Sequence, residues 1–221
     1  VVKAAGIIGI GTFASRILGF IRDMVMARLF GATAAADAFY VAFRVPSLLR
    51  ELFAEGSMSA AFIPVFTEYH QQKTKREAWE LASAVFTTLL TIVTGTVLIG
   101  IAVTPVIVWY LAPGFHEDPA KLTLAIVLSR VMFPYLLFIS LAALAMGILN
   151  SLRAFAAPAF SPLFLNVFMI GCALFLSPQL PEPIVGVAIG VVAGGAAQFA
   201  MQLPGLARRG FLFGWRFEPG H

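Results

Sequence analysis

Four long stretches without charge constrain this chain more than any other feature of its sequence. Residues 81–112, 154–181 and 183–207 contain no charged side chain, and residues 122–150 contain only Arg130. Each stretch exceeds the ~20 mostly apolar residues that an α-helix needs to cross a bilayer. No alternation over about ten residues, typical of an outer-membrane barrel, is present. We therefore expect an all-α, polytopic membrane protein.

The composition agrees with this interpretation. The 221 residues are 60% apolar and only 12% charged, with a mean hydropathy of +0.91. A soluble domain carries about 25% charged residues, so this chain has too few polar side chains to cover a water-facing surface. An ordinary soluble enzyme, a disordered chain and a secreted disulfide-rich domain are therefore excluded. The single cysteine, Cys172, excludes an internal disulfide and a cysteine metal cluster.

The first 70 residues are apolar but interrupted by charges. We interpret them as two further helices, the second of which breaks near Pro46 or Gly56. The whole chain is then one transmembrane unit of six helices, expected at residues 4–30, 37–69, 79–112, 121–150, 156–177 and 183–207.

The distribution of basic residues predicts how these helices are oriented. The chain carries 15 basic and 11 acidic residues, and the alternate breaks between helices differ in basic content. By the positive-inside rule, the basic breaks and both termini face the cytoplasm. The basic residues that decide this are Lys3, Lys73, Lys75, Arg76, Arg153, Arg208, Arg209 and Arg216. The first apolar run continues past any plausible cleavage site, so we expect a spanning helix and not a cleaved signal peptide. The chain starts at Val1, not Met, and stops in a polar stretch, so we expect it to be part of a longer protein.

Three charges lie well inside the first expected helix, at Arg16, Arg22 and Asp23. One charge at the centre of a spanning helix raises the free energy of membrane insertion by about 2.5–3.5 kcal/mol, whereas one Leu, Ile, Phe or Val lowers it by only about 0.3–0.6 kcal/mol. Facing lipid, the three would cost roughly 8–10 kcal/mol, so we expect them to face protein, water or one another. Arg16 and Asp23 are seven residues apart and are predicted to share a helix face.

Similar charges occur in two other helices, and together they indicate a polar cavity. Several arginines around one cavity suit a polyanionic headgroup, because guanidinium groups match phosphate oxygens in shape and charge. The predicted ligand-binding set is Arg16, Arg22, Asp23, Asp37, Arg50 and Arg130. Alternatively, acidic and basic side chains on neighbouring helices pair and only hold the bundle together.

Three glycines in the last helix have a different interpretation. Gly186, Gly190 and Gly194 recur every four residues, and this small-xxx-small spacing lets two membrane helices approach closely. We predict that they serve packing.

Sequence motifs for catalysis are absent. The chain contains no Ser–His–Asp arrangement, no GxxxxGK[ST] loop, no HExxH and no CxxC. We expect neither an enzyme nor a metal, cofactor or nucleic-acid site. An intramembrane lipid-modifying enzyme would have only Asp23 and Asp37 as candidate acid–base groups, which makes it the weakest alternative.

Several motifs resemble one known family. Residues 15–23 resemble the first helix of the MurJ (MviN) family of bacterial lipid II flippases, within the multidrug/oligosaccharidyl-lipid/polysaccharide (MOP) exporter superfamily. Residues that continue the resemblance over essentially the whole chain are 31–32, 37–46, 48–64, 133–135, 147–150, 157–162 and 202–204.

The resemblance implies a fold and residue roles. The family fold has fourteen helices in two lobes around a central cavity, and this chain would be the six-helix N-terminal lobe. The six charged residues predicted above match positions in or near that cavity, where Arg16, Arg22 and Arg130 would contact pyrophosphate. Ser15, Glu55 and Gly56 would belong to a gate, which the family has at the cytoplasmic side.

The resemblance also implies a function. The protein would move the headgroup of lipid II, an undecaprenyl-pyrophosphate-linked disaccharide-pentapeptide, from the cytoplasmic to the outer face of the bacterial inner membrane by alternating access. Its partners would be lipid II, membrane lipids and the C-terminal lobe that this chain lacks. The alternatives are another MOP-type lipid-oligosaccharide or drug exporter, and a non-transporting membrane scaffold of cell-wall synthesis.

Overall fold

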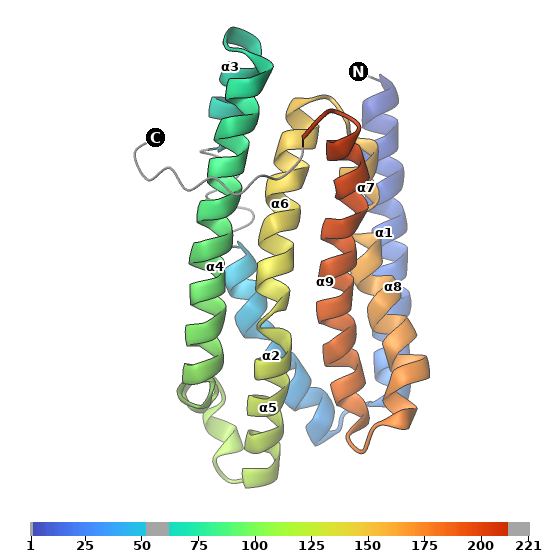
Figure 1. The fold of residues 1–221 in the computed structure, drawn as a ribbon. Helices are drawn as coiled ribbons and strands as arrows, with labels where there is room; N and C mark the ends of the chain where they lie inside the picture. The colour runs from blue at the N-terminus through green and yellow to red at the C-terminus, as the bar shows by residue number, and fades with distance from the viewer. Residues whose placement is uncertain (1, 52–61, 212–221) are drawn as a thin grey trace.

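The computed structural model describes residues 2–51 and 62–211, which form helices and connecting turns without any strand (Figure 1). The prediction of an all-helical chain is confirmed. The helices are α1 Val2–Leu29, α2 Ala34–Arg50, α3 Ile63–Gln72, α4 Lys75–Leu111, α5 Pro119–Met132, α6 Tyr135–Ser151, α7 Ala156–Phe160, α8 Leu163–Gly171 and α9 Pro183–Ala207, with short helices η2 Pro113–Phe115, η3 Cys172–Leu176 and η4 Ser177–Gln179.

Four segments of the described chain are long and apolar enough to cross a bilayer. They are Lys75–Leu111, Pro119–Ser151, Ala156–Gln179 and Pro183–Ala207, the same four regions that the charge-free stretches predict. Helix α1, with 28 residues, is about 42 Å long and runs along the bundle beside them. The count of six spans stays a prediction, because residues 52–61, between α2 and α3, lie outside the described residues.

Prolines divide two of these segments. Pro134 separates α5 from α6, and Pro162 separates α7 from α8. Proline has no N–H to donate and its ring crowds the preceding turn, so a continuous α-helix is interrupted there. After α8, within the segment Ala156–Gln179, residues Cys172–Leu176 form a turn of π-helix.

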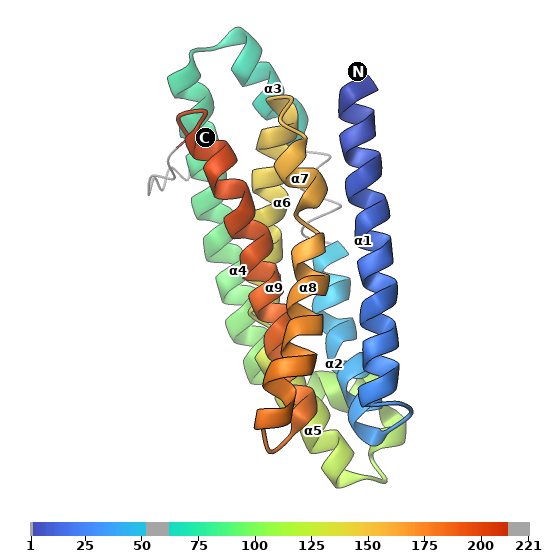
Figure 2. The same ribbon diagram turned by 90° about the vertical axis from the view of Figure 1, so that its right-hand side faces the viewer.

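Glycines allow α9 to pack closely against α8 and η4, as the four-residue spacing predicts. A Cβ atom on Gly186 would lie 2.6 Å from Ser177 Oγ, and one on Gly190 would lie 2.9 Å from the Phe168 carbonyl oxygen. On Gly194 it would lie 2.8 Å from the Cα of Leu165. Helix α9 also packs against α6, while α8 lies between α9 and α1 (Figure 2).

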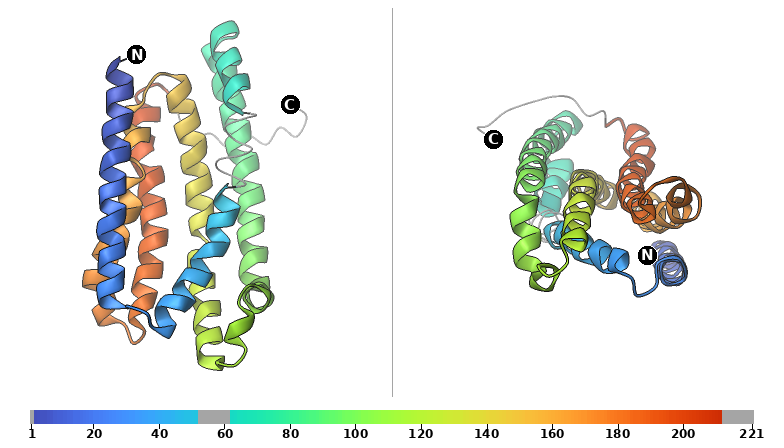
Figure 3. Two further views of the ribbon diagram at one scale, coloured as in Figure 1. Left: turned by 180° about the vertical axis from the view of Figure 1, so that it is seen from behind. Right: turned by 90° about the horizontal axis from the view of Figure 1, so that it is seen from below.

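Helices α1 and α2 diverge, and this divergence creates the space for a site. They are joined by a tight turn in which Gly31 has a φ of +54° and Thr33 caps α2 by accepting a hydrogen bond from the Ala36 amide. From that turn α1 leans on α7 and α8, whereas α2 crosses towards α5 and α6 (Figure 3). The gap between them therefore widens towards the end of the bundle that holds the N-terminus.

Candidate functional site: a cavity with arginines on two walls

A cavity of about 410 Å³ lies between α1, α2, α6, α8 and α9. Its apolar part is built mainly from α6, including Tyr135, Ile139 and Met146. Its polar side chains come from all five helices and from the α7–α8 junction: Ser15, Arg22, Ser47, Arg50, Tyr135, Ser161, Asn166, Gln198 and Gln202. The cavity can therefore hold a ligand with both charged and neutral polar groups.

One face of α1 supplies the first wall. A Cβ atom on Gly11 would lie 2.8 Å from the carbonyl carbon of Ala159, so α1 touches α7 closely at this point. Ser15 and Arg22 lie on the same helical face as Gly11, because four and eleven residues are close to one and three turns. The contact of α1 with α7 thus directs both residues towards the cavity.

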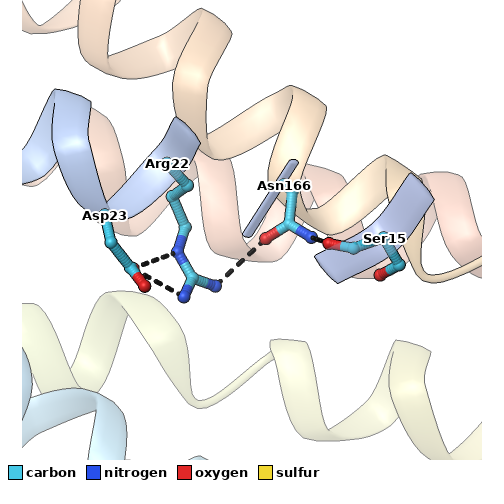
Figure 4. A network of polar contacts seen from close by, with 4 residues as sticks. All are labelled: Ser15, Arg22, Asp23 and Asn166. Atoms are coloured by element: carbon cyan, nitrogen blue, oxygen red, sulfur yellow. Dashed lines mark hydrogen bonds and ion pairs between the residues drawn. The ribbon is translucent and has the colours of Figure 1, made fainter. Parts of the chain in front are cut away.

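Hydrogen bonds hold the Arg22 guanidinium in place (Figure 4). Its Nε and Nη2 atoms donate to Asp23 Oδ1 at 3.0 and 2.7 Å, and Nη1 donates to Asn166 Oδ1 at 3.0 Å. Asn166 in turn donates from Nδ2 to the Ser15 carbonyl oxygen at 3.3 Å. A guanidinium carries five N–H groups, so these three bonds leave one N–H on each terminal nitrogen for a ligand.

The second wall carries Arg50, near the C-terminal end of α2, and Ser47 one turn before it. Arg22 and Arg50 are both half-buried and both line the cavity. Because they come from two helices that diverge, the cavity presents positive charge from two directions. This arrangement favours an anion with several oxygens.

The remaining predicted residues lie outside the cavity lining. Asp23 is mostly exposed and reaches the site only through its bond to Arg22. Arg16 is exposed. It lies about 140° around the axis of α1 from Gly11, so it is on a different face of the helix. Arg130 is exposed on α5 and donates from Nε to the Ile101 carbonyl oxygen of α4 at 3.3 Å. Ligand-binding roles for Arg16 and Arg130 stay predictions.

Asp37 lies at the opposite end of α2 from Arg50. Its Oδ2 atom accepts a hydrogen bond from Lys121 Nζ of α5 at 2.6 Å, and the same Nζ lies 4.4 Å from the centre of the Phe115 ring. Asp37 therefore joins α2 to α5 in this structure, and its predicted contact with substrate stays a prediction. Of the predicted gate residues, Ser15 lines the cavity, whereas Glu55 and Gly56 lie outside the described residues.

The neutral part of the site was not predicted from the sequence. Asn166, Gln198 and Gln202 carry amide side chains and lie within charge-free stretches. Their exposed fractions are only 6%, 5% and 1%, respectively. Buried amides inside spanning helices are themselves a signal, because an unsatisfied polar group is costly in an apolar environment. That signal could have identified all three.

Fold and site together define a class: a helical membrane protein with an arginine-containing cavity between its helices. Comparison with known proteins makes the assignment specific. The family model described as "Lipid II flippase MurJ" matches residues 26–220. The chain belongs to the MurJ family.

Individual relatives agree with the family assignment. The chain is 43% identical over 197 residues to "Lipid II flippase MurJ" of Burkholderia cenocepacia, which covers 89% of this chain and 38% of the relative. It is 44% identical over 229 residues to "Probable lipid II flippase MurJ" of Vibrio cholerae, which covers 99% of this chain and 43% of the relative. The chain thus spans about two fifths of the length of these relatives.

A solved structure has the same fold. "Lipid II flippase MurJ, inward closed conformation" superposes with a TM-score of 0.76 at 29% sequence identity, covering 94% of this chain and 43% of that chain. The part matched corresponds to the N-terminal lobe. The predicted fold class, part of a MurJ-type helical membrane protein, is confirmed.

Proposed function

We propose that this chain forms the N-terminal wall of a cavity that binds the headgroup of lipid II, and that the complete protein moves this headgroup across the bacterial inner membrane by alternating access. The observation that carries the proposal is the Arg22 guanidinium, held by Asp23 and Asn166 with two N–H groups left over. The family membership supports the same function and disfavours a drug exporter or a scaffold.

The chemistry of the site suits a pyrophosphate. Arginine binds phosphate oxygens through parallel N–H groups. Arg22 has two N–H groups left for such contacts, and Arg50 adds a second positive charge on the other wall. In a site that excludes water, these interactions are stronger than at an open surface. Asp23 compensates the charge of Arg22 when no ligand is present, so the guanidinium is not left as an unpaired charge.

The positions of the basic residues support an orientation of the chain in the membrane. The N-terminus, the α3–α4 turn with Lys73, and the α6–α7 turn with Arg153 lie at the same end of the bundle (Figure 1). We place this end in the cytoplasm, in keeping with the positive-inside rule. We propose that the headgroup enters the cavity from this end while the lipid tail remains in the bilayer.

No chemical transformation is needed for this function. The headgroup is bound, carried and released unchanged, and we propose a transporter rather than an enzyme. Movement of the lobes would expose the cavity alternately to the two sides of the membrane.

The experiment that tests the proposal uses the full-length parent protein and native mass spectrometry. Retention of lipid II is compared with that of phosphatidylglycerol for the wild type, Arg22→Ala and Arg28→Ala. Arg28 is a matched control, because it is an exposed arginine of the same helix outside the cavity. We expect preferential retention of lipid II that Arg22→Ala weakens and Arg28→Ala does not. Equal retention of both lipids by the wild type would refute the proposal.

A further inference from the structure

The cavity has a second polar region, formed by Ser161, Gln198 and Gln202, which we call the amide cluster. All three residues line the cavity and are buried, with exposed fractions of 3%, 5% and 1%, respectively. Ser161 and Gln202 belong to residues 157–162 and 202–204, two motifs of the sequence that the proposed function leaves without a role. The fold brings these two motifs into contact.

Hydrogen bonds within the amide cluster determine how the Gln202 amide is turned. Gln202 Nε2 donates to the carbonyl oxygens of Ala142 at 3.1 Å and Gln198 at 3.2 Å, and reaches Ser161 Oγ at 3.4 Å. Ser161 Oγ donates to the same Gln198 carbonyl oxygen at 3.2 Å. Two of the three Nε2 partners are backbone carbonyls, which only accept. The nitrogen must therefore face them, and the oxygen must face away.

This arrangement leaves Gln202 Oε1 without a donor. The atom is buried and has no hydrogen-bond partner among the described residues. A buried carbonyl oxygen in this state is unfavourable, and an incoming N–H or O–H group relieves the penalty. Because Gln202 lines the cavity, a ligand in the cavity can bring such a donor to Oε1 after a small displacement of the side chain.

We infer that the amide cluster is a second subsite, which binds a neutral hydroxyl or amide N–H of the ligand whose phosphates lie at Arg22. This inference rests on the proposed function. Ser161, Gln198 and Gln202 line the same cavity as Arg22 and its partner Asn166. One ligand can therefore contact Arg22 with its phosphates and the amide cluster with a neighbouring sugar. An uncharged acceptor also suits this place, because a carboxylate there would repel the phosphates.

The test compares two lipids that share the pyrophosphate and differ in the neutral part. Undecaprenyl pyrophosphate and lipid II are each titrated into the full-length protein, and binding is measured by native mass spectrometry. Gln202→Met removes the acceptor while keeping the length of the side chain. Ser140→Ala is the matched control, because Ser140 Oγ is also buried with no hydrogen-bond partner in the described part of the chain, but lies on α6 outside the cavity lining.

We expect Gln202→Met to weaken lipid II binding by about three- to tenfold, the effect of one hydrogen bond, and to leave undecaprenyl pyrophosphate binding as in the wild type. Ser140→Ala should change neither. If Gln202→Met does not accumulate in folded form, Gln202→Asn replaces it and the same result is expected. Asn keeps the amide, but its side chain is shorter by one methylene, so its oxygen lies farther from the ligand.

The outcomes separate this inference from the proposed function. Equal weakening of both lipids by Gln202→Met, or no weakening of either, overturns the second subsite while the pyrophosphate site stands. Wild-type protein that binds neither lipid overturns the proposed function itself. Arg22→Ala, which should weaken both lipids, distinguishes the two subsites in the same experiment.

Discussion

Substitution of Gly190 by alanine tests the contact between α8 and α9. A Cβ atom at this position would lie 2.9 Å from the Phe168 carbonyl oxygen, 3.0 Å from Cys172 Cβ and 3.1 Å from Met169 Cα. Two of these three atoms are backbone, so rotation of a side chain cannot make room and α8 itself has to move. Overpacking of this kind costs about 1–3 kcal/mol.

A second glycine provides the control for this measurement. Gly95 lies inside α4, and a Cβ atom there would have no neighbour within 4 Å. Both substitutions gain about 1 kcal/mol of helix propensity, so that gain cancels when the two variants are compared. Gly190→Ala should therefore be less stable than Gly95→Ala by about 1–3 kcal/mol, the overpacking cost alone.

The assay is thermal or denaturant unfolding of the full-length protein in detergent, with wild type and both variants measured in parallel. Gly95→Ala should be at least as stable as the wild type. Equal stability of the two variants would refute the reasoning, because it would mean that α9 does not need glycine to approach α8.

Two other contacts give measurable predictions. Asp37→Asn, Lys121→Met and the double variant form a cycle that measures the coupling between the two side chains. We expect a coupling free energy of unfolding of about 0.2–1 kcal/mol, because Asp37 is largely exposed and solvent weakens the ion pair. Additive effects of the two substitutions would show that the pair does not join α2 to α5. Thr74→Ala removes a capping box in which Glu77 N donates to Thr74 Oγ1 at 3.3 Å and Thr74 N donates to Glu77 Oε2 at 2.8 Å. We expect faster amide hydrogen exchange in the first turn of α4 and a loss of about 1 kcal/mol, whereas Thr96→Ala, at a site within α4, should leave exchange in that first turn unchanged.

The candidate site could be predicted from sequence only in part. Arg22 and Arg50 belong to the charges that the sequence singled out, and both line the cavity. Their contact with a ligand stays a prediction. Arg22 could not be separated from Arg16 by sequence, since both are arginines inside the same helix. Their difference depends on the rotation of α1 about its axis, which the close contact between Gly11 and Ala159 sets.

Contacts between residues far apart in the sequence could not be predicted, for a related reason. Asp37 and Lys121 are 84 positions apart, and Arg22 and Asn166 are 144 apart. Periodicity describes which residues share a face of one helix, but it does not say which other helix that face meets. The i,i+7 spacing correctly predicts that Arg16 and Asp23 share a face of α1, but it does not reveal that the Asp23 carboxylate binds the adjacent Arg22.

The sequence by itself determined that the chain is a helical membrane protein, where its long apolar segments lie, and to which family it is similar. It could do so because the bilayer excludes charge and unpaired backbone groups, and this constraint acts on each segment separately. Only the tertiary structure decided which side chains line the cavity, and that Gln202 Oε1 has no donor within residues 2–51 and 62–211. These features depend on how α1, α2 and α9 are turned relative to one another, and packing between helices, rather than any single segment, sets that rotation.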